Sequence, residues 1–233
     1  MERGQDLICL VLLSLRGQVR VGLYTWPPME LRGLYVITDR GLARGRSHED
    51  VVAAALRGGA RIIQLRDKDA PREELLAVGR RLAKLCGDAG ALFIVNDDPA
   101  LAAEVGAGGV HVGPSDPPPD EARRIMGADA VVGWSIKGSV ETARQAQARG
   151  VSYVAVGSIF ATTTKAGAVE IGVDAIRRVR EAVSLPVAAI GGINATNVGE
   201  VIRAGAGMAC VIGAAVAAPD IQLACREISR IIE

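Results

Sequence analysis

Residues 34–65, LYVITDRGLARGRSHEDVVAAALRGGARIIQL, contain an apolar run, a segment with helical spacing and a second apolar run. The two runs, 34–38 and 62–65, are short and rich in aliphatic residues, which is typical of buried strands. Ser47 precedes the helical segment at 50–56 as a candidate cap, and Gly58 follows it. The stretch therefore predicts two parallel strands joined by a crossover helix.

The same pattern continues to the end of the chain. Further strands are expected at 92–95, 110–112, 130–132, 153–156, 187–190 and 209–212, with helices such as 73–83, 175–182 and a closing helix at 219–232. Asp98, Ser139 and Asn194 are candidate caps, and Gly150 and Gly205 are candidate helix ends. Eight strand–helix units predict an α/β protein with a single-domain (β/α)8 TIM barrel, because closure leaves no sheet edge exposed.

A doubly wound open sheet is the structural alternative. Its Gly-x-Gly-x-x-Gly fingerprint is approached only at Gly205-Ala-Gly207-Met-Ala-Cys210. Cys stands there in the third place, and the stretch leads into a strand rather than a helix. The sequence therefore favours the barrel.

Composition excludes several classes of function. The chain has 27 Lys and Arg against 26 Asp and Glu, and only 3% aromatic residues. A net charge of +1 gives no support for binding to nucleic acid or to a membrane, and few aromatics argue against stacking on single strands. Cys9, Cys86, Cys210 and Cys225 lack the spacing of a zinc or redox motif, so we expect a reduced, cytoplasmic protein.

The first 30 residues do not fit the repeating pattern. The apolar stretch Leu7–Leu13 is much shorter than the roughly 20 residues that a membrane span needs. It also lacks the basic start and the cleavage site of a signal peptide. We therefore expect residues 1–30 to be an appended or poorly ordered extension rather than a targeting signal, with Met29 as an alternative start, and residues 31–233 to be the barrel.

Polar residues follow the second expected strand. Gln64, Arg66 and Lys68 occupy alternate positions, so their side chains should project together at the mouth of a barrel. An amide and two cations suit a diphosphate, because Arg offers a planar fork and Lys a compact charge. The alternative is a solvated strand end, paired with Asp67 and Asp69.

Two carboxylates follow the third and fourth strands. Asp97 and Asp116 would lie at neighbouring strand ends, where they could hold Mg²⁺ together with phosphate oxygens and water. Asp98 precedes Pro99 at a helix start and is therefore expected to be an N-cap rather than a ligand. Taken singly, Asp97 and Asp116 could each be turn residues.

The remaining strand ends are also polar or glycine-rich. The fifth strand reaches Ser135, and the sixth leads into a long loop with Thr162, Thr163, Thr164 and Lys165, which would cover an anion unless it is a plain turn. Gly191 and Gly192, and then Gly213, follow the last two strands, where many barrels bind phosphate. His111 is expected to be structural, and His48 carries no functional signal.

These motifs together resemble the thiamine-phosphate synthase family. The resemblance covers about residues 33–230 and rests on 64–68, 95–98, 109–116, 133–135, 157–165 and 189–193. It implies a TIM-barrel transferase that joins a hydroxymethylpyrimidine diphosphate to a thiazole phosphate and releases diphosphate. The resemblance also implies small-molecule substrates as the partners and Mg²⁺ as the cofactor, and it allows a homo-oligomer.

The resemblance also implies roles for particular residues. Those expected to hold the pyrimidine diphosphate are Gln64, Arg66, Lys68, Asn96, Ser135 and Lys165, of which Arg66, Lys68, Ser135 and Lys165 are also candidate catalytic residues. Those expected to hold the thiazole phosphate are Thr162, Thr163, Thr164, Gly192, Ile212 and Gly213. Asp97 and Asp116 would bind Mg²⁺.

Three positions depart from the family pattern. Gly213 stands where the family usually has Ser, Lys137 where it usually has His, and Ala161 where Pro is common. Two alternatives follow: a thiazole tautomerase, whose histidine is expected at position 137, and a silent barrel that only binds thiamine phosphates.

Overall fold

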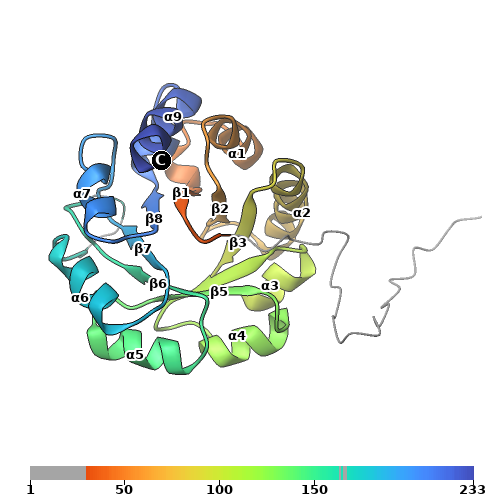
Figure 1. Ribbon diagram of the computed structural model, residues 1–233. Coiled ribbons are helices and arrows are strands. Elements are labelled where there is room, and N and C mark those ends of the chain that lie inside the picture. Colours follow the sequence, from red (N-terminus) through yellow and green to blue (C-terminus); the bar gives the residue numbers. More distant parts are fainter. Residues whose placement is uncertain (1–29, 163, 165–166) are drawn as a thin grey trace, which may run out of the picture.

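The protein, described here from a computed structural model, is a closed barrel of parallel strands surrounded by helices (Figure 1). Residues 30–162, 164 and 167–233 are described, so residues 1–29 of the expected extension lie outside them. The strands are β1 (Gly33–Ile37), β2 (Ile62–Leu65), β3 (Leu92–Asn96), β4 (Gly109–Val112), β5 (Val131–Ser135), β6 (Tyr153–Val156), β7 (Val187–Ile190) and β8 (Met208–Val211). Each pairs with its neighbour in the chain, and β8 pairs with β1.

The helices form the outer layer of the barrel (Figure 1). They are α1 (His48–Arg57), α2 (Arg72–Asp88), α3 (Pro99–Glu104), α4 (Pro119–Met126), α5 (Val140–Ala148), α6 (Asp174–Ala182), α7 (Val198–Arg203), α8 (Gly213–Val216) and α9 (Ile221–Ile232), with a short 3₁₀ turn η1 (Arg40–Leu42). The predicted TIM barrel is confirmed, and the alternative of an open, doubly wound sheet is wrong.

Most helix boundaries follow the signals in the sequence. Ser47 caps α1 in a reciprocal pair with Asp50, and Ser139 accepts a bond from the Thr142 N–H at the start of α5. Asn194 is not the cap that we expected. Its side chain accepts bonds from Thr196 instead, so the chain turns locally and α7 begins after Asn197.

The apolar residues form two layers. Tyr35 and Ile37 of β1 face the barrel interior, whereas Leu34 and Val36 pack beneath the helices. This alternation is the period of two expected of a strand that is buried on both faces. It also determines which polar residues face inward, because Gln64 shares the face of Ile62.

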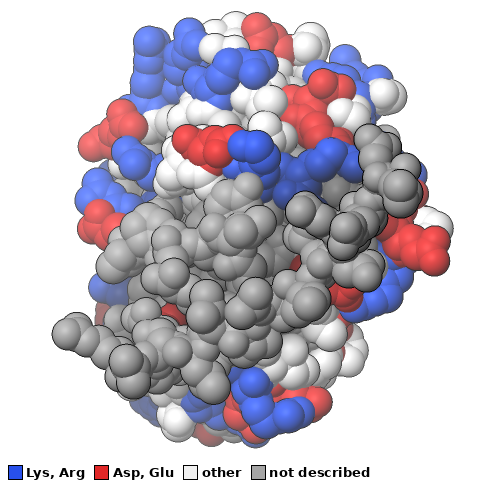
Figure 2. All heavy atoms as spheres, turned by 90° about the vertical axis from the view of Figure 1, so that its right-hand side faces the viewer, with Lys and Arg blue, Asp and Glu red and all other residues white. Residues whose placement is uncertain are grey.

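The described surface carries mixed charge. Figure 2 shows Lys and Arg side chains interspersed with Asp and Glu over the described part of one face. Many of them are paired, as Arg72 is with Asp98 and Glu104. In residues 30–233, apart from the three internal positions that are not described, none of the helices has the length and apolar character needed to cross a bilayer.

Candidate active site

A cavity of about 1070 Å³ opens where the carboxyl ends of the strands converge. The predicted site residues that line it are Gln64, Arg66, Lys68, Asn96, Asp97, Asp116, Ser135, Thr162, Thr164, Gly192, Ile212 and Gly213. Thr163 and Lys165 lie outside the described residues. Every predicted site residue that the structure describes therefore lies at one cavity.

The chain after β2 keeps the alternation of the strand. Arg66 and Lys68 line the cavity, whereas Asp67 points the other way and its side chain is only 3% exposed. Arg66 donates to Asp39 at 2.9 Å, and the Lys68 ammonium lies 3.5 Å from Asp97. The alternative in which these cations pair with Asp67 and Asp69 is therefore wrong.

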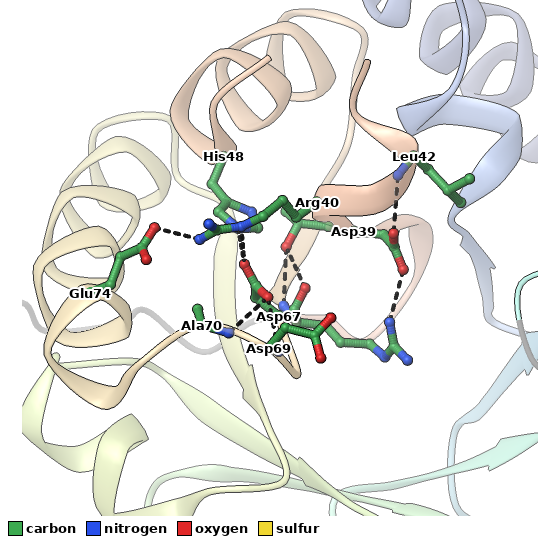
Figure 3. A network of polar contacts seen from close by, with 10 residues as sticks. Asp39, Arg40, Leu42, His48, Asp67, Asp69, Ala70 and Glu74 are labelled. Carbon is green, nitrogen blue, oxygen red and sulfur yellow. Dashed lines mark hydrogen bonds and ion pairs between the residues drawn. The ribbon is translucent and has the colours of Figure 1, made fainter. Parts of the chain in front are cut away.

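Asp67 anchors this segment from behind (Figure 3). Its carboxylate accepts bonds from Arg40 at 2.6 Å and His48 at 3.1 Å, and from the backbone N–H groups of Asp69 and Ala70. Burial alone would raise the pKa of Asp67, but these hydrogen bonds outweigh it and lower the pKa. The anchor holds the backbone between Arg66 and Lys68 in place, so both cations are presented on a fixed loop.

Asp97 and Asp116 form a pair of carboxylates. Burial raises the pKa of Asp97, the hydrogen bond and the charge of Asp116 raise it further, and Lys68 opposes them. The Gly113 N–H fixes Asp116 with a 2.6 Å bond. Two neighbouring carboxylates repel one another unless a proton or a cation lies between them, so the pair fits a divalent cation.

The kind of cation follows from the oxygens available. Among residues 30–233, excluding the three undescribed positions, no cluster of three or more His, Cys, Asp or Glu side chains forms a metal site. A site with two carboxylates that leaves the other positions to water and phosphate suits Mg²⁺ better than zinc. Asp98, in contrast, accepts a bond from the Leu101 N–H and caps α3, as expected.

A chain of hydrogen bonds crosses the barrel interior next to the cavity. The Gln64 amide donates to the Tyr35 hydroxyl at 2.6 Å, and the Tyr35 hydroxyl bonds that of Tyr153 at 3.0 Å. Tyr153 bonds His111 Nδ1 at 3.0 Å, and His111 Nε2 bonds the Ser135 hydroxyl at 2.8 Å. Burial lowers the pKa of His111 to about 4, against the opposing charge of Asp116, so the imidazole is neutral at pH 7.

Backbone turns replace side chains on the opposite side of the cavity. Gly192 has φ +64°, and a Cβ there would lie 2.4 Å from the Ala161 carbonyl oxygen. Only glycine therefore allows this turn to lie so close to the loop that carries Thr162 and Thr164. Gly213 opens α8, in which the Ala215 and Val216 N–H groups bond the Ile212 carbonyl, so the N–H groups at its open end are those of Gly213 and Ala214. Hydroxyls, bare glycine backbone and a helix start together suit a phosphate.

Several cavity or support residues were missed in the sequence. Tyr35, Tyr153 and His111 lie within strands, and their polar atoms meet only when the barrel closes. Asp39, which accepts a hydrogen bond from Arg66, follows β1 directly and carries the same signal as the polar residues at the ends of the other strands. His48 carried no signal, yet it is buried against Asp67.

Comparison with known proteins agrees with this geometry. Residues 34–215 match the family model described as thiamine monophosphate synthase. The chain is 46% identical over 200 residues to the thiamine-phosphate synthase of Roseiflexus sp. strain RS-1, covering 85% of this chain and 84% of the relative. It is 47% identical over 196 residues to that of Methanoculleus marisnigri, covering 84% and 92%.

Solved structures give the same relationship. Thiamine phosphate pyrophosphorylase from Pyrococcus furiosus has a TM-score of 0.80 at 39% identity, covering 87% of this chain and 96% of that one. 3-Hexulose-6-phosphate synthase, at 20% identity and a TM-score of 0.64, is similar in fold alone. The family match, the relatives and the strand-end residues lead to one conclusion: this chain belongs to the thiamine-phosphate synthase family.

Proposed function

We propose that this protein joins 4-amino-2-methyl-5-hydroxymethylpyrimidine diphosphate to 4-methyl-5-(2-phosphoethyl)thiazole, forming thiamine phosphate and diphosphate. The observation that carries the proposal is the shared cavity, which brings two cations, a carboxylate pair and glycine backbone together from different strands. The cations and the carboxylate pair suit a leaving diphosphate, and the glycines suit a second phosphate.

The reaction divides between the two sides of the cavity. On one side the pyrimidine CH2–O bond breaks, leaving a delocalised cation and a diphosphate. Arg66 and Lys68, and Lys165 beyond the described residues, stabilise the negative charge of that leaving group. The thiazole nitrogen then forms the new bond to the CH2 carbon. No general base is required, which suits a neutral His111 that is already bonded at both nitrogens.

Asp97 and Asp116 would hold Mg²⁺ against the diphosphate. When bound, the ion supplies positive charge to the departing oxygens. Lys68, 3.5 Å from Asp97, bridges the metal site and the cationic side of the cavity. Gln64, Asn96 and Ser135 then orient the pyrimidine, while Thr162, Thr163, Thr164, Gly192, Ile212 and Gly213 hold the thiazole phosphate.

We also propose that the protein works in the cytoplasm. Cys86, Cys210 and Cys225 are buried free thiols, and burial raises the pKa of each. Unpaired thiols of this kind suit a reducing compartment.

The direct test combines both phosphorylated substrates with the purified protein and Mg²⁺. We expect thiamine phosphate and diphosphate to appear in equal amounts. Chromatography measures the first product, and a diphosphate assay measures the second. Chelation should stop the reaction, and Mg²⁺ should restore it. Conversion between thiazole tautomers without coupling would point to the tautomerase, and binding of thiazole phosphate with no turnover would point to a silent barrel.

Gly213→Ser should improve binding of the thiazole phosphate. A Cβ at position 213 meets nothing closer than Leu42 Cδ1 at 4.0 Å, and φ there is not in the left-handed region, so a side chain fits. A serine hydroxyl would add a hydrogen bond to an anion, which is worth about 1.5–3 kcal/mol. We expect the KM for the thiazole phosphate to fall by about tenfold, measured by steady-state kinetics. Gly213→Ala is the matched control and should bring no such gain.

A further inference from the structure

Five polar side chains from five strands form one unbroken chain of hydrogen bonds. In order they are Gln64, Tyr35, Tyr153, His111 and Ser135, with donor–acceptor distances of 2.6, 3.0, 3.0 and 2.8 Å. Its two ends are residues that we assign to the pyrimidine diphosphate. The three middle residues have no role in the proposed reaction.

The three middle residues pack against one another inside the barrel. Tyr35 and Tyr153 are 1% and 0% exposed, and the His111 ring stacks on that of Tyr153 with centroids 5.6 Å apart. Gly133 of β5 makes room for them: a Cβ there would lie 2.1 Å from Tyr153 Cζ and 2.4 Å from its hydroxyl oxygen. The strand therefore lacks a side chain where the Tyr153 ring enters.

Proton counting gives the chain a direction. The Gln64 amide donates to Tyr35, so the single hydroxyl proton of Tyr35 is left for Tyr153. Tyr153 then donates its own proton to His111 Nδ1. A neutral imidazole that accepts at Nδ1 carries its proton on Nε2, which donates to the Ser135 oxygen. The Ser135 hydroxyl proton is left for a ligand, and Gln64 keeps its Oε1 as an acceptor.

We propose that Tyr35, Tyr153 and His111 are positioning residues that set Ser135 as a donor and Gln64 as an acceptor towards the pyrimidine. This inference rests on the proposed function. An aminopyrimidine offers a ring nitrogen that accepts and an amino group that donates, which complements such a pair. Reversal of any one bond reverses its neighbours, so the two ends always offer opposite roles and discriminate against a heterocycle without both groups.

The tautomer of His111 tests the direction without any substrate. The protein contains only two histidines, His48 and His111. The ¹⁵N signals of their ring nitrogens are therefore assigned with the variant His48→Gln. We expect a single tautomer with the proton on Nε2 and a hydrogen-bonded, unprotonated Nδ1. A proton on Nδ1, a mixture of tautomers or a charged ring at neutral pH would overturn the proposal.

Tyrosine variants test the chain of hydrogen bonds in the same ¹⁵N spectrum. Tyr153→Phe removes the direct donor and should move the Nδ1 signal towards that of an unbonded ring nitrogen. Tyr35→Phe removes a hydroxyl that bonds Tyr153, and it should produce a smaller shift in the same direction. Ile94→Val, in the same interior layer, removes one methylene and no hydrogen bond, so it is the matched control. If the Nδ1 signal of His111 were unchanged in Tyr153→Phe, the proposed chain of hydrogen bonds would be contradicted.

Steady-state kinetics separates a positioning role from an unspecific disturbance of the fold. Tyr153→Phe should raise the KM for the pyrimidine diphosphate by about tenfold and leave the KM for the thiazole phosphate unchanged. Equal rises in both, or no rise in either, would overturn the positioning role. The two proposals also fail separately: if no variant and no wild-type protein forms product, the proposed function is wrong, whereas the tautomer still decides the direction of the chain.

Discussion

Asp97→Ala is expected to lower kcat/KM by about 10³-fold at saturating Mg²⁺. The substitution removes one of the two carboxylates that fit the metal, and it leaves Lys68 without its partner 3.5 Å away. Charge stabilisation by a metal is worth several kcal/mol, and about 4 kcal/mol corresponds to that factor. Steady-state kinetics over a range of Mg²⁺ concentrations measures it, and the Mg²⁺ needed for half-maximal rate should rise as well.

Asp98→Ala is the matched control for this variant. Asp98 is the next residue, but its side chain caps α3 and bonds Arg72 rather than lining the cavity. Loss of the cap should cost about 1 kcal/mol of folding stability and leave the Mg²⁺ dependence unchanged. Equal losses of activity in the two variants would mean that Asp97 acts through the fold, and the metal assignment would fail.

Arg66→Ala is expected to lower kcat/KM by about 10²- to 10³-fold. The Arg66 side chain is 25% exposed, and Asp39 and the Asp67 anchor hold it and its loop in place before any substrate arrives. Loss of one preorganised donor to developing charge typically has an effect of this size. Most of the loss should appear in kcat, because the charge on diphosphate develops as the C–O bond breaks. Single-turnover kinetics with the pyrimidine diphosphate measures it.

Two further variants make the result for Arg66 interpretable. Arg66→Lys keeps the charge and loses the fork, so it should recover only part of the rate. Arg72→Ala removes an exposed arginine that pairs with Asp98 and Glu104, and it should leave kcat within twofold of wild type. If Arg66→Lys were fully active, a point charge would suffice, and the planar contact with diphosphate would be wrong.

The strands were predictable because buried parallel strands are short, apolar and regularly spaced. β2 was found at its observed bounds, and the alternation of Gln64, Arg66 and Lys68 placed all three at the cavity. Local sequence was a poorer guide where two signals competed. Asn194 looked like a helix cap, but its side chain satisfies a turn first, and α7 starts three residues later than that signal implied.

The interior hydrogen bonds could not have been found from one strand at a time. Tyr35 and Tyr153 read as ordinary strand residues, and their hydroxyls meet only because β1 and β6 face one another across the barrel. His111 was expected to be structural, and the identity of its two partners depends on that same closure. Charged residues at strand ends are visible in a linear sequence, whereas pairs made across an interior are not.

The seam between β1 and β8 has a consequence for biosynthesis. Gly33 pairs with Met208 and Val36 with Val211, so residues 33–211 must all be synthesised before the last ladder can form. The entropy lost in joining such distant segments is unfavourable until their contacts form, which makes this a slow step. Gly213 follows the seam directly, so a nascent chain that has not yet been synthesised to this point lacks one of the residues that we assign to the thiazole phosphate. Ligand capture should therefore begin only after this seam has closed, and substrate cannot template the earlier stages of folding.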